Sequence, residues 1–187
     1  MEQRGETDVL AGIWERREGL CPVAEVRCAC AAVESKSMRD SDMACKILIV
    51  EDEFIVATEI EYLVAESGNE PVGIAADMPA ARRLADKADV AFVDLNLRDG
   101  PTGHEIGRML AQEHNVTVIY ITANPSQLGR GVPGTLGVIP KPVTEHEMTE
   151  AINFAIAVRT VMDSPIRVPA PSRLRLFSFN DGEGAVA

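Results

Sequence analysis

The run Ile47-Leu48-Ile49-Val50, followed at once by Glu51-Asp52-Glu53, decides the fold of this 187-residue chain. Short runs rich in Val and Ile that end abruptly in polar residues are typical of strands buried in a parallel sheet. Three later runs end in the same manner: Val90–Val93 before Asp94, Val116–Ile121 before Thr122, and Val138–Pro140 before Lys141. Each run therefore predicts a buried strand that carries a chemically active side chain at its end.

Helix-like segments separate these strands. Residues 53–67 carry Ile55, Ile60, Leu63 and Val64 at spacings that suit a buried stripe, and Gly68 suits a left-handed helix end. The other expected helices are residues 79–87, 104–113 and 144–161, and residues 71–75 are expected to form one more strand. Alternating strands and helices predict an α/β fold with a parallel sheet and right-handed crossovers.

Residues far apart in the sequence are therefore expected to meet. In an open parallel sheet, the groups at the carboxyl ends of the strands converge on one crevice. We expect Glu51, Asp52, Asp94, Thr122 and Lys141 to share that crevice. Taken singly, each residue has an ordinary interpretation as a turn or capping residue, but the joint pattern favours a site.

The chain resembles the receiver domain of two-component response regulators. The resemblance spans roughly residues 45–160 and rests on four stretches in order: residues 47–53, Val-Asp-Leu-Asn-Leu at 93–97, Ile-Thr-Ala at 121–123, and Lys-Pro at 141–142. It implies a doubly wound, flavodoxin-like sheet of five parallel strands in the order 2-1-3-4-5.

Phosphoryl transfer to a carboxylate needs a nucleophilic oxygen, a divalent cation and donors to the phosphoryl oxygens. Asp94, at the end of the central strand, is the predicted phosphoacceptor. Glu51, Asp52 and Asp94 are the predicted ligands of Mg²⁺, because crowded carboxylates suit a hard cation that takes oxygen ligands. By resemblance, the backbone carbonyl of Asn96 supplies a further ligand.

Three further groups are expected to act on the phosphoryl group. Thr122 offers a hydroxyl and Ala123 a backbone N–H to its oxygens. Lys141 offers an ammonium that can pair with Asp94 before transfer and with the phosphoryl group afterwards. Pro142 is expected to follow a cis peptide, which proline permits at low cost.

Two features depart from the receiver pattern. Residues 129–137 contain four Gly and one Pro, which oppose helix formation by about 1 kcal/mol per Gly and about 3 kcal/mol for Pro. The fourth helix is therefore expected to be shortened or irregular, with at most one or two turns near residues 126–129. Many receivers carry an aromatic residue three positions before the lysine, where this chain has Val138. Switching without a rotating ring and ordering of the Gly-rich loop both remain open.

Composition limits the classes of partner and the domain layout. The net charge of −11 argues against binding a nucleic-acid backbone, and no apolar run approaches the ~20 residues of a membrane span. We expect a cytoplasmic protein with an extension over residues 1–43, a receiver over 44–162 and a tail over 163–187. The extension is expected to be flexible, unless translation starts at Met38 or Met43 and the upstream residues are not part of the natural protein.

The four cysteines do not indicate a metal centre. Cys21, Cys28, Cys30 and Cys45 form no C-x-x-C pair and have no histidine nearby, so a structural zinc site is not expected. Free thiols are the expected state, with a redox role for Cys28 and Cys30 as the alternative.

We expect a receiver that takes a phosphoryl group onto Asp94 from a histidine kinase or histidine phosphotransfer protein. It would signal by binding a downstream protein, and its chemistry would be limited to its own phosphorylation and dephosphorylation. One alternative is a phosphorylation-silent scaffold or dimerisation module of the same fold. Another is a small flavodoxin-like or phosphatase-like enzyme, which the acids after the first strand disfavour because they repel a nucleotide phosphate.

Overall fold

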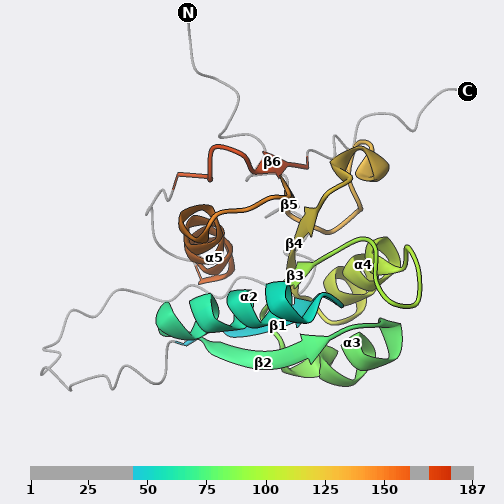
Figure 1. Ribbon diagram of the computed structural model, residues 1–187, viewed down its shortest axis with the longest axis horizontal. Helices are drawn as coiled ribbons and strands as arrows, with labels where there is room; N and C mark the ends of the chain where they lie inside the picture. Colours follow the sequence, from blue (N-terminus) through green and yellow to red (C-terminus); the bar gives the residue numbers. More distant parts are fainter. Residues whose placement is uncertain (1–43, 161–168, 178–187) are drawn as a thin grey trace, which may run out of the picture. The chain divides into compact units, whose positions relative to one another are not determined.

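Six strands form one sheet in the order β2-β1-β3-β4-β5-β6 in the computed structural model, which describes residues 44–160 and 169–177 (Figure 1). The first five strands run parallel, which confirms the predicted order 2-1-3-4-5, and β6 is antiparallel to β5. The strands are β1 Lys46–Val50, β2 Glu70–Ala75, β3 Val90–Val93, β4 Thr117–Thr122, β5 Gly137–Pro140 and β6 Arg175–Leu176. Expectations for residues 1–43, 161–168 and 178–187 lie outside the described residues.

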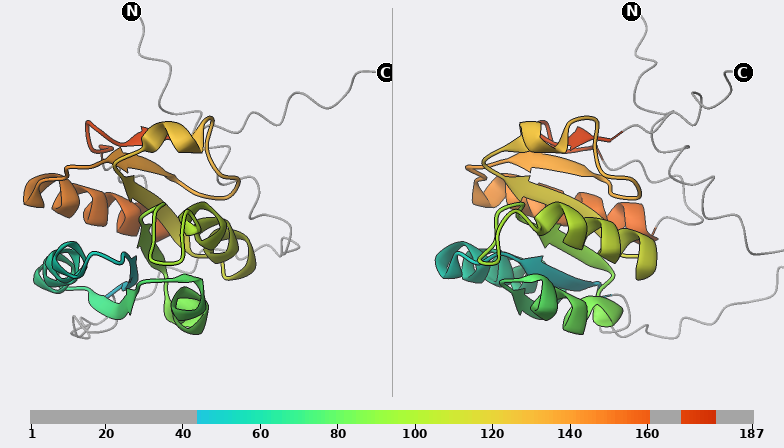
Figure 2. Two further views of the ribbon diagram at one scale, coloured as in Figure 1. Left: turned by 45° about the vertical axis from the view of Figure 1, so that its right-hand side comes forward. Right: turned by 90° about the vertical axis from the view of Figure 1, so that its right-hand side faces the viewer.

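Helices cover both faces of this sheet. They are α2 Phe54–Glu66, α3 Met78–Leu84, α4 Gly103–Glu113 and α5 Glu145–Thr160, with short 3-10 turns η3 Ala85–Lys87 and η4 Pro125–Leu128. Helices α2 and α5 contact each other on one face, and α3 and α4 contact each other on the other (Figures 1 and 2). Strands β3 and β4 are buried along their whole length, and accordingly β3 is apolar throughout and β4 carries polar groups only at Thr117, Tyr120 and Thr122.

Local signals fix the ends of two helices, and the one at Gly68 is as predicted. Asp77 caps α3 by accepting a hydrogen bond from the Ala80 N–H at 2.9 Å, with Pro79 in the first turn. Gly68 ends α2 with φ of +75°, and its N–H donates to the Ala65 carbonyl. No helix in residues 44–160 or 169–177 has the length and apolar character that crossing a bilayer requires.

One core prediction is wrong. Ile55 was expected in the buried stripe of α2, but its side chain is 80% exposed, and Ala57 takes that place beside Ile60, Leu63 and Val64. Val64 is nine positions after Ile55, and at 3.6 residues per turn this puts the two on opposite sides of the helix.

The segment between β4 and β5 has the predicted irregular form. Only η4, residues 125–128, is helical there, and the chain then turns through Gly129, Gly131 and Gly134, all with positive φ. Gly131 is required by packing as well as by conformation, because a Cβ at this position would lie 2.4 Å from the ring of Phe177.

The C-terminal segment, residues 171–177, adds a strand that the sequence analysis did not predict. Gly137 and Val138 of β5 pair with Leu176 and Arg175, and the Phe177 N–H donates to the Leu136 carbonyl at 3.0 Å. Phe177 is 1% exposed and packs against Tyr120, with ring centroids 6.3 Å apart. The segment therefore supplies an aromatic side chain to the core on the side of the sheet that α3 and α4 cover.

Replacing Phe177 with Ala should lower the free energy of unfolding by about 3 kcal/mol, because the change removes a fully buried ring and leaves a cavity. Denaturant unfolding monitored by circular dichroism measures this. The matched control is Phe54→Ala, which removes the same side chain from a site that is 75% exposed and should change stability by less than about 0.5 kcal/mol. Equal losses for the two variants would contradict the docking of residues 171–177.

Candidate functional site

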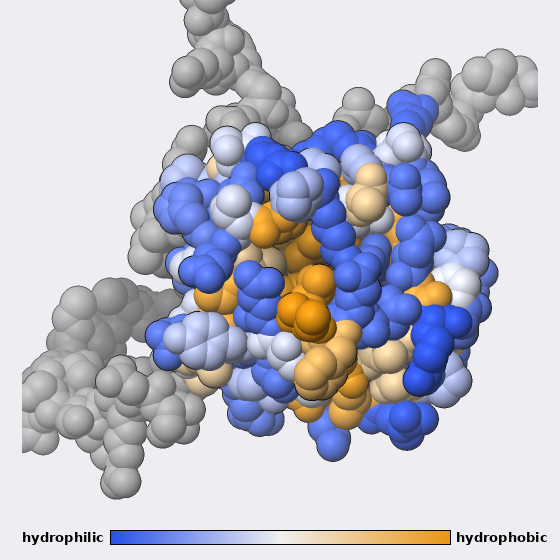
Figure 3. Space-filling model, in the orientation of Figure 1, coloured by the Kyte–Doolittle hydropathy of each residue, from blue (hydrophilic) through white to orange (hydrophobic). Residues whose placement is uncertain are grey.

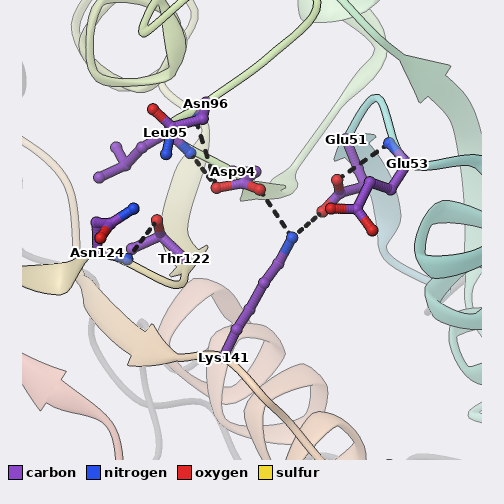
Figure 4. Close-up of polar contacts among 8 residues, drawn as sticks. All are labelled: Glu51, Glu53, Asp94, Leu95, Asn96, Thr122, Asn124 and Lys141. Atoms are coloured by element: carbon purple, nitrogen blue, oxygen red, sulfur yellow. Dashed lines mark hydrogen bonds and ion pairs between the residues drawn. The ribbon is translucent and has the colours of Figure 1, made fainter.

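One lysine joins two acids at the carboxyl ends of the strands. Lys141 Nζ lies 2.7 Å from Glu51 Oε2 and 2.7 Å from Asp94 Oδ2 (Figure 4). These residues are 90 and 47 positions away from Lys141 in the sequence. The two carboxylate side chains are 2% and 9% exposed and that of Lys141 is 19% exposed, so the three charges meet in a largely dehydrated place.

Backbone hydrogen bonds that continue the sheet past the strand ends hold these residues in place. The Glu51 N–H donates to the Ala75 carbonyl at 2.9 Å, and the Asp94 N–H donates to the Val50 carbonyl at 2.8 Å. The Lys141 N–H donates to the Thr122 carbonyl at 2.9 Å. The peptide bond between Lys141 and Pro142 is cis, as the sequence analysis predicted.

Burial and pairing act in opposite directions on the charges. Burial raises the pKa of Glu51, although hydrogen bonding and attraction to Lys141 oppose it. Burial alone would lower the pKa of Lys141, but the hydrogen bonds from its ammonium to Asp94 and Glu51 and the attraction to these two charges together outweigh burial and raise that pKa. The lysine is therefore firmly charged, and Glu51 is an acid that gains from a nearby cation.

Asp94 is held through both of its oxygens. While Oδ2 accepts from Lys141, Oδ1 accepts from the N–H of Leu95 at 2.5 Å and from that of Asn96 at 3.4 Å. The backbone of Asp94 is packed closely against the start of α4, because a Cβ at Gly103 would lie 1.9 Å from the Asp94 carbonyl oxygen. Backbone donors and an ammonium thus surround one carboxylate at the end of β3.

Thr122 and Ala123 lie at the neighbouring strand end. Thr122 is fully buried, and its Oγ1 accepts a hydrogen bond from the Asn124 N–H at 3.2 Å. Ala123 is exposed, and Figure 4 shows Thr122 and Asn124 on the side of Asp94 opposite Glu51. The hydroxyl at the end of β4 and the backbone of the loop after it therefore lie beside Asp94.

The expected metal ligands fit Mg²⁺ in chemistry. Across residues 44–160 and 169–177, no three acidic, His or Cys side chains are grouped to hold a metal as they stand, because Glu51 and Asp94 point at Lys141 and Asp52 is exposed. Carboxylate and carbonyl oxygens are nevertheless the donors that Mg²⁺ takes, and Asp52 is free of competing hydrogen bonds within that range. A cation would also relieve the cost of ionising the buried Glu51.

One residue that supports the site, Arg173, was not predicted from the sequence. Arg173 donates hydrogen bonds to the carbonyls of Pro140 and Pro142, the residues on either side of Lys141. The alternation of basic and apolar residues in Arg173-Leu174-Arg175-Leu176 is the signal that marks a half-buried strand there.

Comparison with known proteins agrees with this geometry. A family model described as the response regulator receiver domain matches residues 47–153. The phyllosphere-induced regulator PhyR of Methylorubrum extorquens is 32% identical over 120 residues, which are 62% of this chain and 45% of PhyR. The sensory transduction protein RegX3 of Mycobacterium tuberculosis is 32% identical over 115 residues, 59% of this chain and 50% of RegX3. The chain thus spans about half the length of the curated relatives it matches.

Solved structures show the same likeness. The receiver domain of Erythrobacter litoralis PhyR superposes with a TM-score of 0.58 at 25% identity, covering 66% of this chain and 98% of that one. PhyR from Brucella abortus gives a TM-score of 0.53 at 31% identity, covering 62% and 48% respectively. PhyR from Bartonella quintana, described as an anti-anti-sigma factor, gives 0.51 at 27% identity, covering 64% and 49%.

Lys141→Met should destabilise the protein by about 3 kcal/mol at pH 8 in the absence of divalent cations, because two crowded carboxylates lose their cation. Without Lys141 the pKa of Glu51 rises further above its unfolded value. A group with a raised folded pKa contributes stability that is present at low pH and is lost as pH rises through that pKa. The loss in free energy of unfolding relative to wild type should therefore be smaller at pH 5 than at pH 8.

Urea unfolding of wild type and variant at both pH values measures this deficit. Lys87→Met removes an exposed lysine and serves as the control, for which no pH-dependent deficit is expected. A Lys141→Met deficit of the same size at pH 5 and pH 8 would contradict the proposed electrostatics.

Proposed function

This chain belongs to the response regulator receiver domain family, and from that premise we propose that it accepts a phosphoryl group on Asp94 and signals by binding another protein. The observation that carries the proposal is the contact of Lys141 with both Asp94 and Glu51 at 2.7 Å. This contact puts a carboxylate beside an ammonium at the carboxyl end of a parallel sheet. Ligands of such folds bind at that edge, which supports a reactive role for the carboxylate.

The transfer step follows from these groups. An oxygen of Asp94 attacks the phosphorus of a phosphohistidine, the new P–O bond forms as the P–N bond breaks, and the imidazole leaves with the bonding electron pair. Lys141 then pairs with the phosphoryl group in place of the Asp94 oxygen. The Thr122 hydroxyl and the Ala123 N–H donate to the other phosphoryl oxygens, and water later hydrolyses the acyl phosphate.

We assign the metal ligands to the same strand ends. Glu51, Asp52 and Asp94, with the backbone carbonyl of Asn96, would hold Mg²⁺. When bound, the ion supplies positive charge that offsets the charge of the phosphoryl group. Rotation of Lys141 from Glu51 toward the phosphoryl group would free the Glu51 carboxylate as the cation arrives.

An apolar hollow lies beside the site, and it supports the proposal that the phosphoryl donor is a protein. A cavity of about 450 Å³ is lined by Ile60 and Leu63 of α2 and by Met148 of α5, and reaches Ala123 and Lys141. Figure 3 shows hydrophobic side chains gathered near the middle of one face within a hydrophilic rim. Phe54 and Ile55, in the turn of α2 that follows the acids, are 75% and 80% exposed. Exposed apolar side chains next to a charged site suit a docked helix or loop of the donor protein.

Output through a protein partner is the second part of the proposal. The net charge of −11 disfavours a nucleic-acid target. The name of the Bartonella quintana relative describes action on another protein, which supports the same class of output for this chain.

Incubation with acetyl phosphate and Mg²⁺ should add one phosphoryl group to wild-type protein, measured by intact mass. Asp94→Asn should abolish the addition, because an amide oxygen is a poor nucleophile. Asp86→Asn, the same change at a side chain that is 87% exposed, should be labelled like wild type. Wild-type protein that stays unmodified would refute the proposal, as would equal labelling of the Asp94 variant.

A phosphorylation-silent scaffold is the second candidate, and the short η4 turn and added β6 strand favour it because they alter the surface around β5. Mg²⁺ binding separates the two. A phosphoacceptor should bind Mg²⁺ by isothermal titration calorimetry, with Asp52→Asn weakening the affinity about tenfold or more, since one anionic ligand is lost. No Mg²⁺ binding by wild type would favour the scaffold.

A further inference from the structure

The backbone on both sides of Lys141 is held by a single arginine. Arg173 Nη2 donates to the Pro140 carbonyl at 3.0 Å, and Nη1 donates to the Pro142 carbonyl at 2.8 Å. Prolines have no N–H, so these carbonyls are the hydrogen-bonding groups that they offer. The planar fork of a guanidinium suits two acceptors with Lys141 between them.

Glu147 fixes the orientation of the guanidinium. Arg173 Nη1 lies 3.1 Å from Glu147 Oε1, while Glu147 Oε2 accepts from the N–H and the hydroxyl of Thr144 at 2.8 and 2.9 Å. These contacts, led by the Thr144 N–H, hold the pKa of Glu147 below its ordinary value. The acid is therefore charged at neutral pH and tied to the start of α5, which follows the Lys141 loop.

Arg173 is itself part of an anchored segment. Leu174 and Phe177 are buried, and Arg175 donates to the carbonyls of Gly129 at 2.9 Å and Pro125 at 3.3 Å. The C-terminal segment therefore contacts the chain after β4 and the chain after β5. Thr122 ends β4, and these two loops begin with Ala123 and Lys141, which together are the groups assigned to the phosphoryl group.

We propose that Arg173 is a positioning residue for phosphoryl transfer, which acts through the Pro140 and Pro142 carbonyls to keep Lys141 within reach of Asp94. This inference rests on the proposed function of Asp94. The Lys141 N–H is held by the Thr122 carbonyl, so Arg173 completes the restraint of the lysine backbone from the opposite side. Its loss leaves the Lys141 side chain attached to a looser loop.

The expected effect is a slower reaction with the fold retained. A misplacement of about 1 Å in a catalytic group costs up to ~10²-fold in rate. Because Arg173 acts through the backbone around Lys141 and does not contact the reacting atoms, we expect Arg173→Ala to slow labelling by acetyl phosphate about tenfold. Arg173→Lys keeps the charge but replaces a planar fork with one nitrogen, so it should recover part of the rate.

Two measurements on the 187-residue chain test the proposal. The first is the rate of labelling by acetyl phosphate with Mg²⁺, followed by intact mass. The second needs no phosphorylation: an amine-reactive ester is applied, and modification of Lys141 is compared by mass spectrometry with that of the exposed Lys46 and Lys87. Arg130→Ala, which removes an exposed arginine from the neighbouring loop, is the matched control, and thermal unfolding checks the fold of each variant.

The proposal predicts that Arg173→Ala raises the relative reactivity of Lys141 several-fold and slows labelling, while Arg130→Ala changes neither. Unchanged Lys141 reactivity in Arg173→Ala would overturn it, whether or not the protein is phosphorylated. A reactive Lys141 with a wild-type labelling rate would overturn it too. If Lys141 becomes reactive but wild type takes no phosphoryl group, the positioning contact stands and the proposed function fails. Should Arg173→Ala fail to fold, the reactivity of Lys141 and the labelling rate are measured on Arg173→Lys, for which the same two changes are expected at smaller size.

Discussion

Two buried carboxylates share one ammonium in this protein, and the rest of the site depends on that contact. Lys141 holds Glu51 and Asp94 together across the ends of β1, β3 and β5. The ammonium stabilises this cluster, because buried carboxylates without a partner cation are costly. The same requirement makes the site responsive, since an arriving cation or phosphoryl group alters the balance that holds Lys141 where it is.

Much of the arrangement was predictable because parallel sheets impose it. Once the runs that end at Val50, Val93, Ile121 and Pro140 are taken as adjacent strands, the residues that follow them must lie at one edge. Asp94 and Lys141 were expected to meet on this ground, and the structure has them 2.7 Å apart. The irregular segment after β4 followed from its glycines, whose positive φ values exclude a regular helix.

What the sequence analysis missed depends on packing between distant segments. Ile55 has the composition of a core residue, but its angular position on α2 places it in solvent at the edge of the site. The segment 171–177 forms only a two-residue strand, and its docking depends on β5 offering a free edge and on space beside Tyr120. The strand propensity of so short a segment does not identify the strand with which it pairs. The roles of Arg173 and Phe177 could therefore be recognised only in the structure.

The segment 171–177 supplies an aromatic residue close to position 138, where this chain has valine. Val138 is buried in β5, and Phe177 packs in the same core cluster, against Tyr120 and the Gly-rich loop. An aromatic ring is therefore present on this face of the sheet, but it comes from the C-terminal segment. The Gly-rich loop that follows Thr122 is thus packed through Gly131 against Phe177, a residue from the far end of the described chain, which joins the site to the surface around β5.

Chemical trapping of the acyl phosphate tests the central claim most directly. Borohydride reduces an aspartyl phosphate to homoserine, and tryptic cleavage after Lys87 and Arg98 releases a peptide that contains both Asp89 and Asp94. Fragmentation of that peptide after treatment with acetyl phosphate and Mg²⁺ should place homoserine at position 94, with Asp89 unchanged. Homoserine at Asp89 or at another acid, or no homoserine in protein that carries a phosphoryl group, would contradict the account.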